Sequence, residues 1–228
     1  MLQKAGLGGR VRVGVPLPVV DPLHRVISPS PPGAEADDAL NVLLRPSRGE
    51  PRGRLIEIEG GPSSGRTALA YRLAAGARGL VGWVDLPNAL DPRSLQRAGV
   101  ELGGLLWIRP VRTGAAFRSA ELLLRTGFAL VVVDLEGAAQ HALERLGPPI
   151  WSRLWRAVRE ARATTVLLGT KRTSGSFATL GLYTERRRTL FDRGLFEGLE
   201  ISATIGRNRA GPTGTEYDLR LSHRPAPG

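Results

Sequence analysis

The stretch Leu55-Ile-Glu-Ile-Glu-Gly-Gly-Pro-Ser-Ser-Gly-Arg-Thr67 decides the fold. A short alternating strand ends at Gly60, four residues follow, and Gly65, Arg66 and Thr67 complete the pattern G-x-x-x-x-G-K-[S/T], with arginine in place of lysine. The glycines let backbone N–H groups converge on phosphate, and the helix that follows directs its positive N-terminus to the same point. Arginine carries its charge on a larger planar group, which does not substitute freely where a compact ammonium is needed. The stretch therefore predicts the fold of a nucleotide-hydrolysing protein with an impaired site.

A second anchor of the loop is predicted at the end of the apolar strand 128–134. In phosphate-binding-loop proteins an aspartate at this point holds the magnesium ion of the nucleotide, together with the threonine of the loop. The alternative is that Asp134 is retained from the fold and caps the turn that follows. The predicted nucleotide-binding residues are Gly60, Gly61, Ser63, Ser64, Gly65, Arg66, Thr67 and Asp134. ATP with magnesium, bound without turnover, is their expected ligand; no resident cofactor, no catalytic residue and no separate metal site are predicted.

Composition narrows the class of protein. The chain has 228 residues, 42% of them hydrophobic and 23% charged, which is typical of a soluble globular domain. A net charge of +11 favours an anionic partner, either nucleic acid or an acidic protein surface, although strong use of arginine over lysine also reflects genomic base composition. The absence of cysteine excludes disulfides, thiolate catalysis and cysteine metal sites. No apolar run is long enough to span a membrane, so a cytoplasmic location without membrane contact is expected.

The chain divides at about residue 52. Residues 1–52 contain eight prolines and are predicted to form an arm or linker that packs on a partner or on a second copy; a disordered leader is the alternative. Residues 53–222 alternate between strand and helix patterns, and 223–228 are expected to form a disordered tail. Strands are predicted at 55–59, 80–85, 105–108, 128–134 and 164–168, and helices at 67–77, from 91, 115–125 and 149–161. This alternation predicts an α/β fold with a mostly parallel, doubly wound sheet, helices on both faces and a C-terminal β-hairpin.

Four segments resemble RecA recombinases. The stretch 53–67 is similar to their strand and loop, and Asp85-Leu-Pro-Asn-Ala-Leu-Asp-Pro92 is similar to their segment D-A-E-x-A-L-D-P. Residues 99–106 continue the match, and 201–212 resemble the late RecA hairpin. The resemblance covers residues 53–221 and implies a RecA-like phosphate-binding-loop core. It also implies that two basic residues of the hairpin, Arg207 and Arg209, reach across a subunit interface toward nucleotide.

The departures from RecA concern the residues that its chemistry uses. The position of the glutamate that polarises the attacking water is Pro87, and the position of the glutamine that senses the γ-phosphate is Gly169. The loop lysine is Arg66. Loss of a positioned base alone lowers a rate by about 10²–10⁴-fold, and loss of a cation that stabilises the transition state lowers it further. The resemblance therefore implies a protein that does not hydrolyse ATP at a useful rate.

A RecA core with an impaired ATP site is similar to the ImuA family of mutasome accessory proteins. That family acts in the SOS response to DNA damage, where it supports translesion synthesis and mutagenesis. The resemblance implies contacts with RecA, with the inactive Y-family polymerase relative ImuB and with an error-prone polymerase. Self-association is a further expectation, because the arm before residue 53 can pack on a second copy.

Two segments could serve binding. Residues 169–182 occupy the place of the mobile DNA-binding loop of RecA, and the alternative is an ordinary surface loop. In the helix 149–161, Trp151 and Trp155 flank an arginine-rich side, where one tryptophan at least is expected in the core. The predicted DNA or partner contacts are Lys171, Arg172, Phe177, Arg207 and Arg209.

Three functions are thus weighed. The first is an interaction protein that occupies a RecA-type interface without hydrolysing ATP. The second is a DNA-binding module that uses the basic surface, and its binding would fall steeply with salt. The third is a weak DNA-dependent ATPase, against which Arg66 and Pro87 argue.

Overall fold

The structure of the protein is a computed structural model that describes residues 53–138 and 140–222. The predicted arm, 1–52, and the predicted tail, 223–228, lie outside these residues. Within the described part, no helix combines the length and the apolar character that a membrane span requires.

One eight-stranded sheet organises the chain, in the order β3-β2-β4-β5-β1-β6-β7-β8. Its strands are β1 (Arg54–Gly60), β2 (Val81–Asp85), β3 (Leu105–Ile108), β4 (Leu130–Asp134), β5 (Thr164–Gly169), β6 (Leu180–Asp192), β7 (Leu195–Asn208) and β8 (Glu216–Ser222). The first six strands in chain order pair in parallel, and β7 and β8 add to β6 in antiparallel register. The predicted α/β class, the mostly parallel sheet and the C-terminal hairpin are confirmed.

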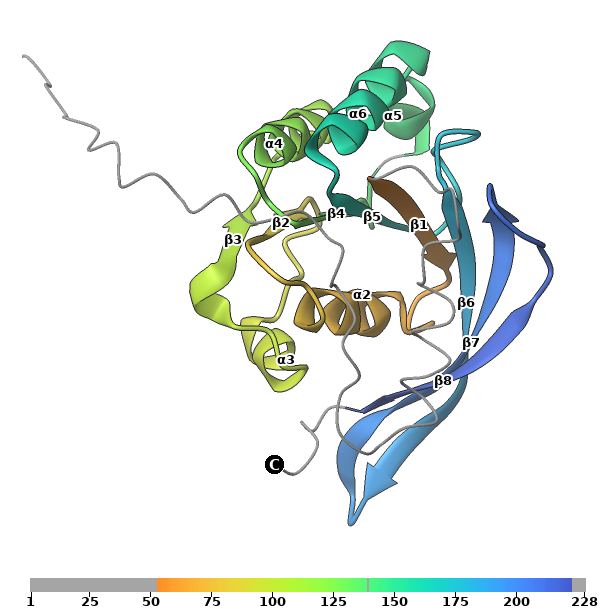
Figure 1. Ribbon diagram of the computed structural model, residues 1–228. Helices are drawn as coiled ribbons and strands as arrows, with labels where there is room; N and C mark the ends of the chain where they lie inside the picture. Colours follow the sequence, from red (N-terminus) through yellow and green to blue (C-terminus); the bar gives the residue numbers. More distant parts are fainter. Residues whose placement is uncertain (1–52, 139, 223–228) are drawn as a thin grey trace, which may run out of the picture.

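Helices cover both faces of the parallel part (Figure 1). On one face lie α2 (Arg66–Ala75) and α3 (Pro92–Arg97); on the other lie α4 (Thr113–Arg125), α5 (Gln140–Glu144) and α6 (Pro148–Ala161). Strands β2 and β4 are buried on both faces, which explains their continuous apolar sequences. A doubly wound arrangement follows from this burial.

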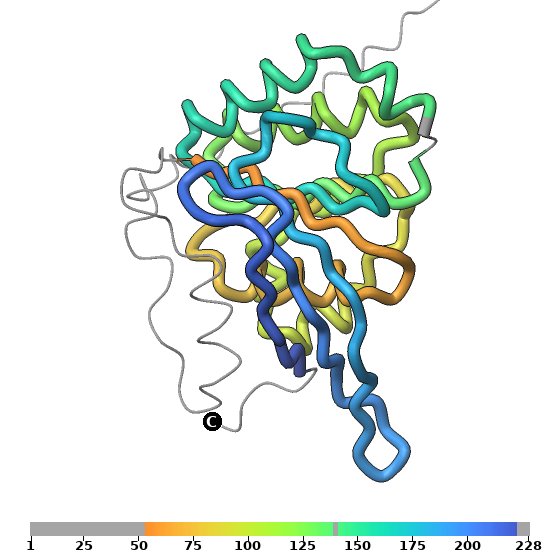
Figure 2. The backbone as a smooth tube through the Cα atoms, turned by 90° about the vertical axis from the view of Figure 1, so that its right-hand side faces the viewer, coloured from red at the N-terminus to blue at the C-terminus, as the bar shows by residue number. Residues whose placement is uncertain are grey.

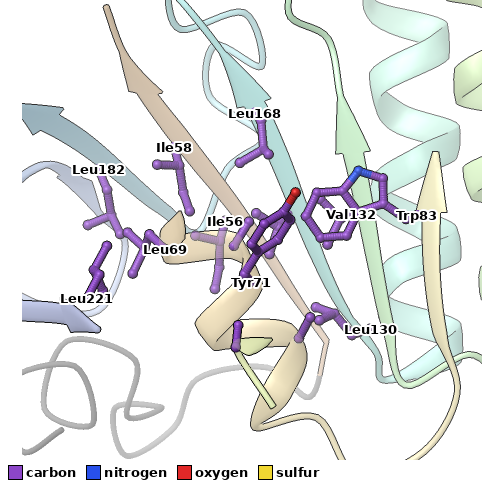
Figure 3. Packing of buried hydrophobic residues seen from close by; sticks show 14 of the residues in the cluster. Ile56, Ile58, Leu69, Tyr71, Trp83, Leu130, Val132, Leu168, Leu182 and Leu221 are labelled. Carbon is purple, nitrogen blue, oxygen red and sulfur yellow. The ribbon is translucent and has the colours of Figure 1, made fainter. Parts of the chain in front are cut away.

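The core beneath α2 fixes the helix that carries the loop. Leu69 and Tyr71 of α2 pack on side chains of the central strands, including Ile56 and Val132 (Figure 3). The ring of Tyr71 lies 5.3 Å from that of Trp83, at an interplanar angle of 59°. Burial of such rings is a large part of core energetics, so the start of α2 is held against the sheet.

The sequence patterns missed β6 and α5. Strand β6 contains the charged run 185–188, which breaks the apolar alternation of a half-buried strand. Strands β6 and β7 form a long hairpin that projects from the body (Figure 2). Its two-residue turn is Arg193-Gly194, both with positive φ, and Phe191, Leu195 and Phe196 are exposed at its tip.

Candidate nucleotide-loop site

The loop between β1 and α2 has the backbone that its glycines predict. Gly65 has a φ of 91° and Ser63 a φ of 58°, both in the left-handed region. A Cβ atom at Gly60 would lie 2.5 Å from Ser64 Oγ and from the carbonyl oxygen of Thr184, so no side chain fits there. The loop therefore turns tightly into the N-terminus of α2, which suits a phosphate group.

Strands β6 and β7 close one side of the loop. The hydroxyl groups of Ser64 and Thr184 lie 3.0 Å apart in a hydrogen bond. A Cβ atom at Gly65 would lie 2.6 Å from Cγ2 of Ile201, which is fully buried. Neither Thr184 nor Ile201 was found from the sequence as a neighbour of the loop, because both are separated from it by more than 115 positions.

Arg66 does not extend into solvent. Its side chain is 4% exposed, and Nη2 donates to Oε1 of Glu136 at 2.9 Å, in an ion pair whose other member is 39% exposed. Nη1 is buried and has no hydrogen-bond partner among the described residues. A buried unpaired guanidinium nitrogen is costly, so this atom favours an oxygen of an anionic ligand. Glu136 is a functional residue that the sequence patterns missed; its position two residues after Asp134 is the signal that could have found it.

Asp134 lies at the end of β4 and is 5% exposed. The pKa of Asp134 is raised to about 6, chiefly by burial; the neighbouring carboxylates Glu136 and Asp85 contribute to the rise, and the backbone N–H of Glu136 and the charge of Arg66 oppose it. Oδ1 of Asp134 accepts the backbone N–H of Glu136 at 2.9 Å. This bond is the turn-capping role considered as one alternative for Asp134.

Asp85 ends the neighbouring strand and is fully buried. Its carboxylate accepts the backbone N–H groups of Ala89 and Leu90 and the indole N–H of Trp107, each at 3.0 Å. These bonds hold the segment that contains Pro87. The carboxylate of Asp85 is thus engaged in hydrogen bonds to the backbone of the segment.

A cavity of about 260 Å³ lies beside the loop. Its lining contains residues 63–67 of the loop, Glu136, the helix residues Tyr71 and Ser94, and Phe196, Leu199 and Leu221 of the hairpin strands. The loop N–H groups and Nη1 of Arg66 fit an anion. Thr67, which lines the cavity, and Asp134, which does not, are oxygen donors of the kind that magnesium takes. The residues therefore fit binding of a phosphate-bearing ligand, although the guanidinium is committed to Glu136.

The predicted DNA-binding loop is tied to the sheet. The buried carboxylate of Glu57 accepts the backbone N–H groups of Thr173 and Ser174 and the hydroxyl groups of both residues. Glu59 accepts the backbone N–H of Arg172 at 2.8 Å. Buried and charged acceptors thus hold the backbone of this part of the loop, and its contact with DNA stays a prediction. The side chains of Lys171 and Arg172 remain exposed.

Arg207 and Arg209 bind the same loop from the other side. Arg207 donates to the carbonyl oxygens of Ala178 (2.8 Å) and Ser176 (3.0 Å), and Arg209 donates to that of Ser176. The guanidinium of Arg209 also lies over the ring of Trp155, 4.8 Å from its centroid. Within one chain neither arginine lines the loop cavity; their role toward a neighbouring subunit stays a prediction. Phe177 is half-buried against the core on the α6 face.

Comparison with known proteins agrees with this geometry. The family model of the RecA N-terminal domain matches residues 34–144. RecA of Mycobacteroides abscessus is 36% identical over 134 residues, which is 57% of this chain and 36% of that protein. RecA of Treponema pallidum is 41% identical over 123 residues, or 50% of this chain and 30% of the relative. The chain thus spans about a third of the length of the curated relatives it matches. Over these residues the chain is similar to the RecA N-terminal domain, and the sheet order and the loop are consistent with that similarity.

Proposed function

We propose that this protein is a catalytically degenerate RecA-like accessory factor of SOS translesion mutagenesis. It acts through contacts with RecA and with mutasome polymerase components, as the resemblance to the ImuA family implies. The proposal rests on one observation above others, the ion pair between the buried guanidinium of Arg66 and the partly exposed carboxylate of Glu136.

The ion pair bears on catalysis in two ways. The guanidinium that replaces the loop lysine is held by a protein carboxylate, so it is not free to follow charge that develops on a transferring phosphoryl group. Glu136 is the acidic residue that lines the described cavity, and its charge is likewise engaged. Pro87 offers no base, and Asp85 is occupied by backbone N–H groups. A RecA-type scaffold of this kind supports docking rather than turnover.

Nucleotide binding and turnover are separated by two measurements. We expect calorimetry to detect ATP–magnesium binding at the loop, because Nη1 of Arg66 gains a partner, and we expect no phosphate release above background with or without single-stranded DNA. Turnover that disappears on Asp134→Ala or Glu136→Gln would contradict the proposal and favour a weak ATPase.

Contact with RecA is tested by co-purification in low salt, with free RecA and with RecA filaments on single-stranded DNA. Retention of this chain by one of the two forms is expected. Absence of binding to both would count against an accessory role. Binding to DNA alone would support the second candidate.

That second candidate, a DNA-binding module, is favoured by the surface of α6. Arg153, Arg156 and Arg159 are exposed on this helix, and only Arg153 has an ion pair among the described residues, with Glu121. Binding to DNA through such a surface would weaken steeply with salt, by about 0.9 in the log–log slope for each phosphate neutralised on a duplex. A titration of labelled DNA at two salt concentrations measures this slope.

A further inference from the structure

A second cavity lies on the opposite side of the sheet from the nucleotide loop, between α6 and the β5–β6 loop. It has a volume of about 540 Å³ and is lined by Ser152, Trp155, Arg156, Arg159, Glu160 and Phe177. We name these six residues the α6 groove. Its floor is aromatic and its rim carries two arginines and one glutamate.

Positive charge dominates at the rim. Among the described residues, no carboxylate forms an ion pair with Arg156 or Arg159. Arg209 stacks on Trp155 at the edge of the groove. Arg207 and Arg209 both donate to the carbonyl oxygen of Ser176, so their guanidinium groups are neighbours. Burial, and then the charges of Arg207 and Arg159, lower the pKa of Arg209, which indicates that the three guanidinium groups are close together. Such a cluster attracts an anionic ligand.

The groove is preformed. Its loop wall is fixed by Glu57 on one side and by Arg207 and Arg209 on the other, and Thr179 hydrogen-bonds Leu55 of β1 at the end of the loop. Its helix wall is fixed by Leu154 and Val158, which are fully buried. A ligand therefore does not have to order the site when it binds, which lowers the cost of association.

The geometry favours a peptide over a nucleic-acid strand. Single strands bind by stacking bases on open aromatic faces. Here the Trp155 ring is covered by the Arg209 guanidinium, and Phe177 packs against the core. What the groove offers is an apolar floor for one side chain and arginine forks that match carboxylates in a bidentate manner.

From these features we infer that the α6 groove binds an acidic peptide segment of a protein partner, with one apolar side chain against the parts of Trp155 and Phe177 that line the groove and flanking carboxylates on Arg156, Arg159 and Arg209. The inference gives a chemical class to one contact of the proposed accessory role. Its test uses neither RecA nor ATP, so the groove and the proposed function can fail separately.

The test is a fluorescence-anisotropy titration of the full chain with a labelled hexapeptide, Asp-Asp-Leu-Asp-Asp-Phe. The matched ligand is the same peptide with asparagine at each aspartate, and a twelve-residue oligothymidylate is the nucleic-acid probe. The matched variants are Arg156→Gln/Arg159→Gln in the groove and Arg118→Gln/Arg125→Gln on the exposed side of α4, which remove the same charge. Circular dichroism establishes that each variant is folded.

We expect the acidic peptide to bind, the asparagine peptide to bind at least about tenfold more weakly, and the groove variant to lose roughly tenfold in affinity, as two exposed ion pairs would give. The α4 variant should keep wild-type affinity. Equal losses in the two variants would mean non-specific attraction and would overturn the inference. The inference would also be overturned if the peptide did not bind with a Kd below 1 mM, which corresponds to about −4 kcal/mol. It would be overturned as well if the protein bound oligothymidylate and not the peptide, and the groove variant lost that binding.

Discussion

Removal of the carboxylate that holds Arg66 tests the central feature of the site. In Glu136→Gln the Arg66 guanidinium, 4% exposed, loses the charge of its partner, while Nη1 already has no hydrogen bond within the described part of the chain. A hydrogen bond between charged groups contributes about 1.5–3 kcal/mol. Because Glu136 is 39% exposed, water screens part of the interaction, and we expect a loss of about 1–2 kcal/mol. For a domain of this size that lowers Tm by about 2–8 °C.

The assay is thermal and urea unfolding followed by circular dichroism, on Glu136→Gln, Arg66→Met and the double variant. Since removal of both partners leaves no buried charge, the double variant should lose less than the sum of the single losses, with a coupling of about 1 kcal/mol. The matched control is Arg187→Gln, which breaks an ion pair whose members are 51% and 46% exposed, and should change stability by less than about 0.5 kcal/mol. If Glu136→Gln lowers the free energy of unfolding no more than this control does, the Arg66 guanidinium is solvated. The inference that Glu136 holds this guanidinium is then refuted.

Three further predictions concern the same region. Because the pKa of Asp134 is raised from 3.8 to about 6, the folded state favours its protonated form, and this stability is present below about pH 4 and is lost as pH rises through 6. Asp134→Asn should therefore raise the unfolding free energy by about 1–3 kcal/mol at pH 7.5 and have little effect at pH 4. A stabilisation equal at both pH values would contradict the sign of the shift. Gly65→Ala should lower the free energy of urea unfolding more than Gly127→Ala. Both glycines have a φ of 91°, but an added Cβ would lie 2.6 Å from Ile201 at Gly65, whereas at Gly127 it would meet no described atom within 4 Å. Equal losses would show that the close contact with Ile201 carries no cost. Glu57→Gln should cost about 1.5–3 kcal/mol and speed tryptic cleavage after Lys171 and Arg172, since the loop loses its charged acceptor; unchanged cleavage would mean that the loop is held by other contacts.

Much of the architecture was predictable from local patterns. The loop glycines, the apolar strand that ends at Asp134 and the Asp91-Pro92 start of α3 are short-range signals, and the structure has each element at or near the expected bounds. The arginine-rich side of α6 also followed from helical spacing, and Trp151 meets the expectation that at least one of the two tryptophans lies in the core. These features depend on residues within one element, so a sequence contains them completely.

The partners of those elements depend on contacts over long separations. The Arg66–Glu136 pair spans 70 positions, the Ser64–Thr184 bond spans 120, and the Glu57 bonds to the 170s loop span 116 and 117. Strand β6 was missed because its charged run has no apolar alternation; its pairing with β1 and β7 makes it a strand.

The sequence by itself determined that this chain has an α/β core, similar to that of RecA, with an altered phosphate loop, because that information lies in contiguous glycines, one arginine and an apolar strand. Only the tertiary structure decided what the arginine does. Its guanidinium is buried against a carboxylate that the fold brings from the end of another strand, and the energy of a charge depends on what surrounds it rather than on its place in the chain.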